Sequence, residues 1–173
     1  CSSDLHKTLA QFENVLKGRD FKNPILGYRR RIDTDSAVDY FIMQEAFKNV
    51  DGFRRSLYIH RGRDQAHPKR IFFGPLWDFN LAMGNLRFYG MNKSTGWVHQ
   101  KRFVIFQEPF WFRRLVEDPY FVRQLIQRYR ELRSDDGALG DIAISQRIDR
   151  YMSIIANAGK RDRARWKGKK GVR

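Results

Sequence analysis

Apolar residues recur every three or four positions in five stretches of this chain, a spacing typical of helices that bury one face. Each stretch is bounded by residues that favour helix ends, because Ser or Asp accepts the free N–H groups of a first turn and Gly interrupts the helical backbone. The predicted helices run from Ser3 or Asp4 to Gly18, over about 35 to 48 after Asp33 or Asp35, from Glu108 or Pro109 through Val116, from Asp118-Pro119 to Ser134, and over about 141 to 158. In the second of them, the pattern leaves Asp39, Gln44 and Glu45 on the surface.

Between the second and third helices the spacing of apolar residues changes to alternation. Residues 55–60 alternate apolar and polar side chains, 61–68 form a polar turn, and 70–73 are a short apolar return strand. This order predicts an antiparallel hairpin. Residues 84–108 are rich in glycine and polar residues and are expected to form a long surface loop. The predicted fold class is therefore α+β, mainly helical, with a small antiparallel β-hairpin.

Two carboxylates lie beyond the outer ends of that hairpin, Asp51 before it and Asp78 after it. Asp78 sits in the block FGPLWDFNLAMGN, where Leu76 and Trp77 are expected to be buried anchors. A carboxylate held among aromatic rings costs desolvation energy unless a metal, a cation or N–H donors meet it. Because the outer ends of an antiparallel pair lie side by side, we expect Asp51 and Asp78 to face one cleft as a base and a metal ligand. The alternative is structural, with Asp51-Gly52 an ordinary turn and Asp78 a helix cap.

The composition favours an anionic binding partner but does not identify its class. The 173 residues carry 34 Lys and Arg against 19 Asp and Glu, a formal net charge of +15, which favours an anionic partner: nucleic acid, an anionic membrane surface, a phosphorylated ligand or an acidic polypeptide. Cys1 is the only cysteine, so no internal disulfide and no cysteine-based metal site can form. No apolar run is long enough for a membrane span.

The common catalytic signatures are missing. The sequence has no phosphate loop, no dinucleotide fingerprint, no H-E-x-x-H and no G-x-S-x-G. Its four histidines (His6, His60, His67 and His99) lack ligand-like spacing and are expected at the surface or in turns. A Ser-His-Asp hydrolase is therefore disfavoured. No zinc-finger or RNP-type signature supports nucleic-acid binding, which rests on charge alone.

Three blocks carry a family resemblance: D-T-D-S-A-V-D-Y-F-I-M-Q-E, N-V-D-G-F-R-R-S-L-Y-I and F-G-P-L-W-D-F-N-L-A-M-G-N. Together with the later W-F-R-R-L-V-E-D-P-Y-F and R-Y-R-E-L-R, they resemble the CotH kinase family, named for spore coat protein H, from about Gly27 to Trp166. The resemblance implies an atypical protein-kinase fold, with this chain similar to its C-lobe. It also implies transfer of phosphate from ATP to a protein substrate with Mg²⁺ or Mn²⁺.

By this resemblance, Asp51 takes the place of the catalytic-loop aspartate, which orients the acceptor hydroxyl and takes its proton. Asp78 takes the place of the aspartate that holds the metal against the nucleotide phosphates. Family members often carry Asn five residues after the first aspartate, where this chain has Ser56, and the usual W-D-F-D block ends here in Asn80. Ser56 and Asn80 are neutral oxygen ligands, so both departures weaken the attraction for a divalent ion.

Asn49, Arg54 and Arg55 are the remaining site candidates, for contacts with phosphate or substrate; for the two arginines, a nearby carboxylate is the alternative partner. We expect residues 1–159 to form the C-lobe-like domain, as a fragment without a glycine-rich N-lobe, and residues 160–173 to form a frayed basic tail. A non-catalytic surface interaction module is the alternative function. The resemblance also implies secretion or a cell-surface location, and Cys1-Ser2-Ser3 suits a lipoprotein start, although a trimmed chain end is the simpler explanation.

Overall fold

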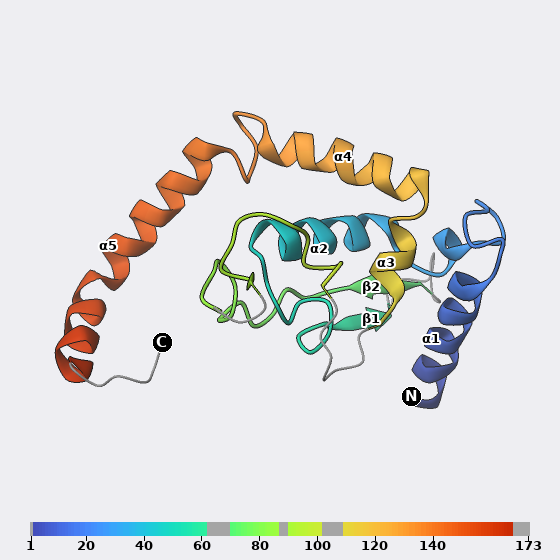
Figure 1. Cartoon of the computed structure of the whole chain (residues 1–173), viewed down its shortest axis with the longest axis horizontal. Coiled ribbons are helices and arrows are strands. Elements are labelled where there is room, and N and C mark those ends of the chain that lie inside the picture. The colour runs from blue at the N-terminus through green and yellow to red at the C-terminus, as the bar shows by residue number, and fades with distance from the viewer. Residues whose placement is uncertain (1, 62–69, 87–89, 102–108, 168–173) are drawn as a thin grey trace. The chain divides into compact units, whose positions relative to one another are not determined.

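The computed structural model describes residues 2–61, 70–86, 90–101 and 109–167. The chain divides into two compact units, Cys1–Ile126 and Gln127–Arg173. The elements shown in Figure 1 are α1 (Ser2–Lys17), the 3-10 turn η1 (Tyr28–Arg30), α2 (Thr34–Ala46), β1 (Ile59–Arg61), β2 (Ile71–Phe73), α3 (Trp111–Leu115), α4 (Pro119–Arg133) and α5 (Asp141–Trp166). The predicted class, mainly helical α+β with one antiparallel hairpin, is confirmed.

Two helices, α2 and α4, begin at predicted capping residues, whereas α3 begins at Trp111, after the predicted Pro109, and without a side-chain cap. The Asp33 carboxylate accepts the N–H of Ser36 at 2.8 Å and caps α2. Asp118 likewise accepts the N–H of Tyr120 at 3.0 Å at the start of α4. These bonds satisfy backbone donors that a first turn leaves without partners. The last helix, α5, continues past the predicted end near residue 158 to Trp166, so the prediction of a frayed tail from residue 160 is wrong for residues 160–166.

The hairpin is shorter than predicted and begins later. β1 pairs antiparallel with β2 in a register that places Ile59 opposite Phe73. Residues 55 and 56 do not join the strand, because the carbonyl of Asp51 accepts the N–H groups of Arg54, Arg55 and Ser56 and folds the start of this segment into tight turns. Alternation in the sequence therefore located the hairpin but not its first residue.

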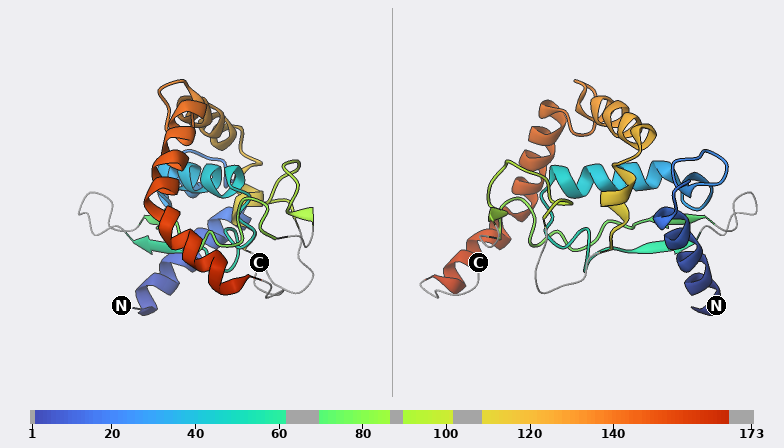
Figure 2. Two further views of the ribbon diagram at one scale, coloured as in Figure 1. Left: turned by 90° about the vertical axis from the view of Figure 1, so that its left-hand side faces the viewer. Right: turned by 45° about the vertical axis from the view of Figure 1, so that its right-hand side comes forward.

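Helix α2 lies along the hairpin, on the side seen above the strands in Figures 1 and 2. The core between them is aromatic, and Phe112 of α3 is at its centre. Its ring centroid lies 5.1 Å from those of Phe53 and Phe73, 5.8 Å from Tyr40 and 5.9 Å from Phe41. Edge-on and offset rings at these separations add to the gain from apolar burial.

Two polar residues of α2 are buried, which corrects the prediction that they lie on the surface. Gln44 and Glu45 are both buried within the fold. The apolar face of α2 meets the hairpin and α3, while Glu45 is covered by the segment that contains Val98 and His99. A periodic pattern identifies one buried face, and it contains no information about a loop that packs on the opposite side.

Several predicted features lie outside the described residues. They are residues 62–68 of the polar turn, residues 87–89 and 102–108 of the long loop, Glu108 as a helix start, and residues 168–173 of the basic tail.

Asp118 joins two segments of the first unit. Its Oδ2 accepts hydrogen bonds from the Tyr28 hydroxyl at 2.9 Å and from Arg29 at 3.0 Å. Burial alone raises the pKa of Asp118, but the N–H of Tyr120, Arg29 and the Tyr28 hydroxyl together lower that pKa below its usual value. Burial is also the main cause of the raised pKa of Tyr28.

We expect the free energy of unfolding to fall with pH below about pH 4, partly because of Asp118. Its pKa is lower in the folded protein than in the unfolded chain, so its contribution is complete above the unfolded value and is lost as pH falls through the folded one. Asp118→Asn should destabilise the protein by about 1–3 kcal/mol at neutral pH and flatten the acid limb. Urea unfolding at several pH values measures both effects. An unchanged acid limb would contradict the assignment, and Asp136→Asn, at an exposed position, is the control.

Candidate functional site

Helix α2 holds the turn that contains Asp51. The Tyr40 hydroxyl donates to the carbonyl of Gly52 at 2.5 Å and approaches that of Ser56 at 3.3 Å. Tyr40 is buried, and burial raises the pKa of its hydroxyl, so this donor keeps its proton at physiological pH. The aromatic core thus fixes the backbone that follows Asp51.

Gly52 lets this turn approach α2 closely. A Cβ placed on Gly52 would lie 2.1 Å from Oε1 and 2.8 Å from Cγ of Gln44, which is wholly buried. No side chain therefore fits at position 52 unless Gln44 moves. Glycine is therefore required at position 52 because of the close contact with Gln44, and not only because Asp-Gly pairs favour turns.

We expect Gly52→Ala to destabilise the protein by about 1–3 kcal/mol, because the added methyl group overpacks a filled site. Gln44→Ala removes every atom that obstructs this methyl group. The double variant should therefore be more stable than the two single effects predict, with a coupling of about 1 kcal/mol or more in urea unfolding. Additive effects would contradict the steric explanation. Gly159→Ala, where the nearest atom is a side-chain nitrogen of Arg163 at 3.6 Å, is the control without a clash.

The Asp51 side chain is partly buried and paired. Its Oδ1 lies 2.8 Å from Nη2 of Arg54, with the two side chains 16% and 7% exposed. The sequence left two partners open for Arg54, a phosphate or substrate group and a nearby carboxylate, and the structure shows an ion pair with the carboxylate. Arg55 is exposed on the same turn.

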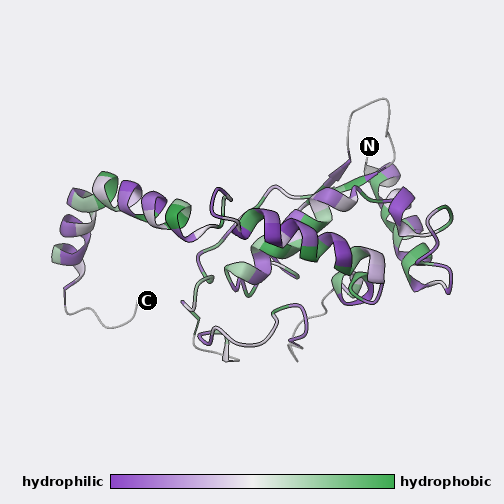
Figure 3. Cartoon of the chain, turned by 90° about the horizontal axis from the view of Figure 1, so that it is seen from above, coloured by the Kyte–Doolittle hydropathy of each residue, from purple (hydrophilic) through white to green (hydrophobic). Residues whose placement is uncertain are grey.

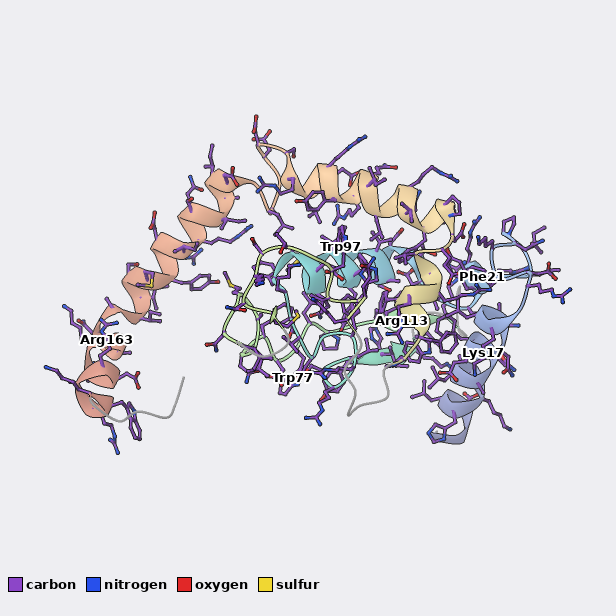
Figure 4. The ribbon with its side chains drawn as sticks, viewed as in Figure 1. Lys17, Phe21, Trp77, Trp97, Arg113 and Arg163 are labelled. Atoms are coloured by element: carbon purple, nitrogen blue, oxygen red, sulfur yellow. The ribbon has the colours of Figure 1, made fainter. Side chains whose placement is uncertain are left out.

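Asp78 lies on an exposed segment, which corrects the expectation of a buried setting. Leu76 is 45% exposed and Trp77 is 55% exposed, so neither is a buried anchor. The Trp77 ring makes an edge contact with Tyr58 at 6.0 Å between centroids (Figure 4). No helix follows Asp78 in the described segment 70–86, and its φ of 58° is left-handed, so it is not a helix cap.

Ser56 links the two carboxylate-bearing segments. Its N–H donates to the carbonyl of Asp51 at 2.9 Å, and its hydroxyl lies 3.4 Å from Oδ2 of Asp78. Asn49 makes a second link, because its side-chain amide donates to the backbone carbonyl of Asp78 at 3.3 Å. The structure therefore brings the side chains of Asn49 and Ser56 to Asp78 and joins the backbone of Asp51 to Ser56. The Asp51 carboxylate itself pairs with Arg54, and Asn80 is exposed two residues beyond Asp78.

The oxygen atoms of this cluster suit a hard divalent cation. Asp78 offers an exposed carboxylate, Ser56 a hydroxyl, and Asn49 a buried Oδ1 that has no hydrogen-bond partner among the described residues. Mg²⁺ and Mn²⁺ prefer such oxygens, and Mg²⁺ usually binds one or two carboxylates together with phosphate and water. Within the described part of the chain, no group of three or more His, Cys, Asp or Glu residues forms a metal cage. The donor set fits a metal that a nucleotide helps to hold.

Sequence reasoning missed a buried pair next to this cluster. The Glu45 carboxylate accepts the N–H groups of Val98 and His99, both at 2.8 Å, and lies 2.6 Å from Nδ1 of the His99 ring. The His99 ring is also 4.9 Å from that of Phe41. His99 lies in a turn, as expected, but it is buried. The only local sign of this buried pair in the sequence was that the acidic residue, Glu45, adjoins the apolar positions of α2.

Comparison with known proteins assigns the chain to a family. The family model described as CotH kinase protein matches residues 2–172. The chain belongs to the CotH kinase family. Searches of curated proteins and of solved structures returned no match.

Membership confirms the resemblance seen in the three sequence blocks and supports a kinase-related function for this CotH protein. In general terms, a kinase-like family also suggests a nucleotide, a divalent metal and a protein substrate. The described helices include none that is long and apolar enough to cross a bilayer.

Proposed function

We propose that this CotH-family chain is an atypical protein kinase domain that transfers the γ-phosphoryl group of ATP to a hydroxyl group of a protein, with Mg²⁺ or Mn²⁺. The observation that supports it best is the meeting of the Asp51 and Asp78 segments at Ser56 in a chain of this family. Phosphoryl transfer suits so small a cluster, because positioning and charge neutralisation provide most of the catalysis.

In this proposal Asp78 binds the metal, with Ser56, Asn80 and the Oδ1 of Asn49 as neutral oxygen ligands. The bound metal would neutralise charge on the phosphate oxygens. The exposed Asp78 carboxylate is accessible to a metal–nucleotide complex without any rearrangement of the core. Because Asp78 is the only charged ligand of the four, we expect moderate metal affinity that depends strongly on the nucleotide phosphates.

Asp51 is the proposed base. The acceptor hydroxyl oxygen forms a bond to the γ-phosphorus, the bond to the β–γ bridging oxygen breaks, and ADP leaves with that electron pair. The hydroxyl proton passes to the Asp51 carboxylate. The ion pair with Arg54 and the bond from Tyr40 to the adjacent Gly52 hold this carboxylate in one orientation. Arg55, exposed on the same turn, is the proposed contact for phosphate or substrate.

The test is transfer of labelled γ-phosphate by the purified full chain, to itself and to an added protein substrate, with Mg²⁺, with Mn²⁺ and with EDTA. We expect transfer that requires metal and that Asp51→Asn reduces by about 10²-fold or more. Circular dichroism must show that the Asp51→Asn variant is folded, because the change also removes the charged partner of Arg54. Transfer that survives both EDTA and Asp51→Asn would overturn the proposal.

A non-catalytic interaction module is the second candidate. The neutral residues Ser56 and Asn80 favour it, because they leave Asp78 as the single charged ligand, and so does the pairing of Asp51 with Arg54. Calorimetry separates the two functions: nucleotide binding without transfer, or neither, would favour the interaction module.

A further inference from the structure

Helix α5 has an apolar stripe that its own unit leaves uncovered. Ile144, Ile148, Tyr151, Met152 and Ile155 follow one another at helical spacing, and Trp166 continues the row three turns later. In the unit Gln127–Arg173, no residue of α5 is buried. The exposed fractions are 52% for Ile148, 57% for Met152 and 51% for Ile155. Figure 3 shows hydrophobic and hydrophilic residues together along this ribbon.

The rest of α5 is strongly basic towards its C-terminal end. From Lys160 to Lys167, at the end of this helix, the sequence contains five Lys or Arg residues and one Asp. The side chain of Arg163 projects from the ribbon in Figure 4. The Arg165 guanidinium lies 5.7 Å from the ring of Trp166, so an amphipathic indole lies among the cations.

An apolar stripe, a charged opposite face and a Trp residue among basic residues together suit the interface of an anionic bilayer. Aliphatic side chains enter the boundary between headgroups and acyl chains, and Lys and Arg remain at the anionic headgroups. Nucleic acid would be attracted to the cations but would not bury the Ile and Met side chains of the stripe. An acidic protein groove could receive the same helix, but the Trp residue among the cations favours the headgroup region of a membrane.

We propose that α5 is an interfacial helix that binds the surface of bilayers containing anionic phospholipids. The stripe is the part that enters the membrane, and the basic residues between Lys160 and Lys167 provide the attraction to headgroups. The helix lies on the membrane and does not span it. This binding does not depend on phosphoryl transfer.

The test is sedimentation of the full chain with vesicles of phosphatidylcholine alone and with vesicles that also contain phosphatidylglycerol. We expect binding to the anionic vesicles at least about tenfold tighter. Ile148→Ser with Ile155→Ser should weaken that binding by about tenfold or more. The matched control is Ile142→Ser with Ile154→Ser, which removes the same atoms from exposed positions outside the stripe and should change binding by less than about twofold.

Each other outcome would overturn the proposal. Equal losses for the two double variants, with binding abolished by salt, would mean association by charge alone. No vesicle binding, together with a dimer in light scattering that Ile148→Ser with Ile155→Ser dissociates, would mean that a second copy covers the stripe. If the chain neither binds vesicles nor dimerises, an acidic protein becomes the expected partner. Calmodulin, an acidic protein with a groove for amphipathic helices, is the probe for that outcome, and binding to it would support a protein partner. Circular dichroism of every variant verifies that α5 remains helical.

Discussion

Asp78→Asn is expected to lower metal-dependent phosphoryl transfer roughly a thousandfold, because a lost metal ligand removes several kcal/mol of charge stabilisation at the phosphates. The fold should be little affected. Asp78 is exposed, and within the described part of the chain its carboxylate accepts one long hydrogen bond, from Ser56, so the free energy of unfolding should change by less than about 0.5 kcal/mol. Initial rates at saturating ATP, measured together with urea unfolding, separate the two effects.

The metal dependence of the Asp78→Asn variant makes this prediction specific. A weakened ligand set requires more metal, so raising the Mg²⁺ concentration should recover part of the activity of Asp78→Asn and none of that of Asp51→Asn. Asp135→Asn removes one exposed carboxylate elsewhere and is the control for the change in net charge. If Asp78→Asn has the activity and metal dependence of the unchanged protein, Asp78 is not a metal ligand.

Glu45→Ala is expected to destabilise the protein by about 3 kcal/mol or more, the largest effect on stability that we predict. The change leaves two backbone N–H groups and the His99 ring without their acceptor in a site that excludes water. A lower urea midpoint with an unchanged m-value is the expected result. The amides of Val98 and His99 should also exchange hydrogen faster, because the bonds to Glu45 attach their segment to α2.

Glu117→Ala is the matched comparison. Glu117 also pairs with a basic side chain, Arg114, but in an exposed setting, so the same change should cost less than about 1 kcal/mol. Equal costs for the two variants would mean that the buried Glu45 contacts contribute no more than a surface ion pair.

The sequence alone predicted the features that depend on neighbouring residues. Asp118 was recognised as a helix cap, and Asp33 as one of two candidates with Asp35, because a capping carboxylate bonds to N–H groups only two or three residues away. The hairpin was recognised because alternation has a period of two whatever surrounds it. The boundary of β1 was missed, since three N–H groups converge on the Asp51 carbonyl and alternation does not report such turns.

The sequence blocks were also sufficient to identify the CotH family and to choose Asp51 and Asp78 as the proposed site. Only the tertiary structure decided the surroundings of these residues: Arg54 pairs with Asp51, Ser56 links the two segments, and Asp78 is exposed. It also buried Glu45 against His99, which is 54 residues away in the chain. Burial depends on what packs on each face of an element, and segments distant in sequence supply that packing. Local periodicity therefore determined the elements and their caps, whereas long-range contacts determined which polar groups meet and which remain accessible to a ligand.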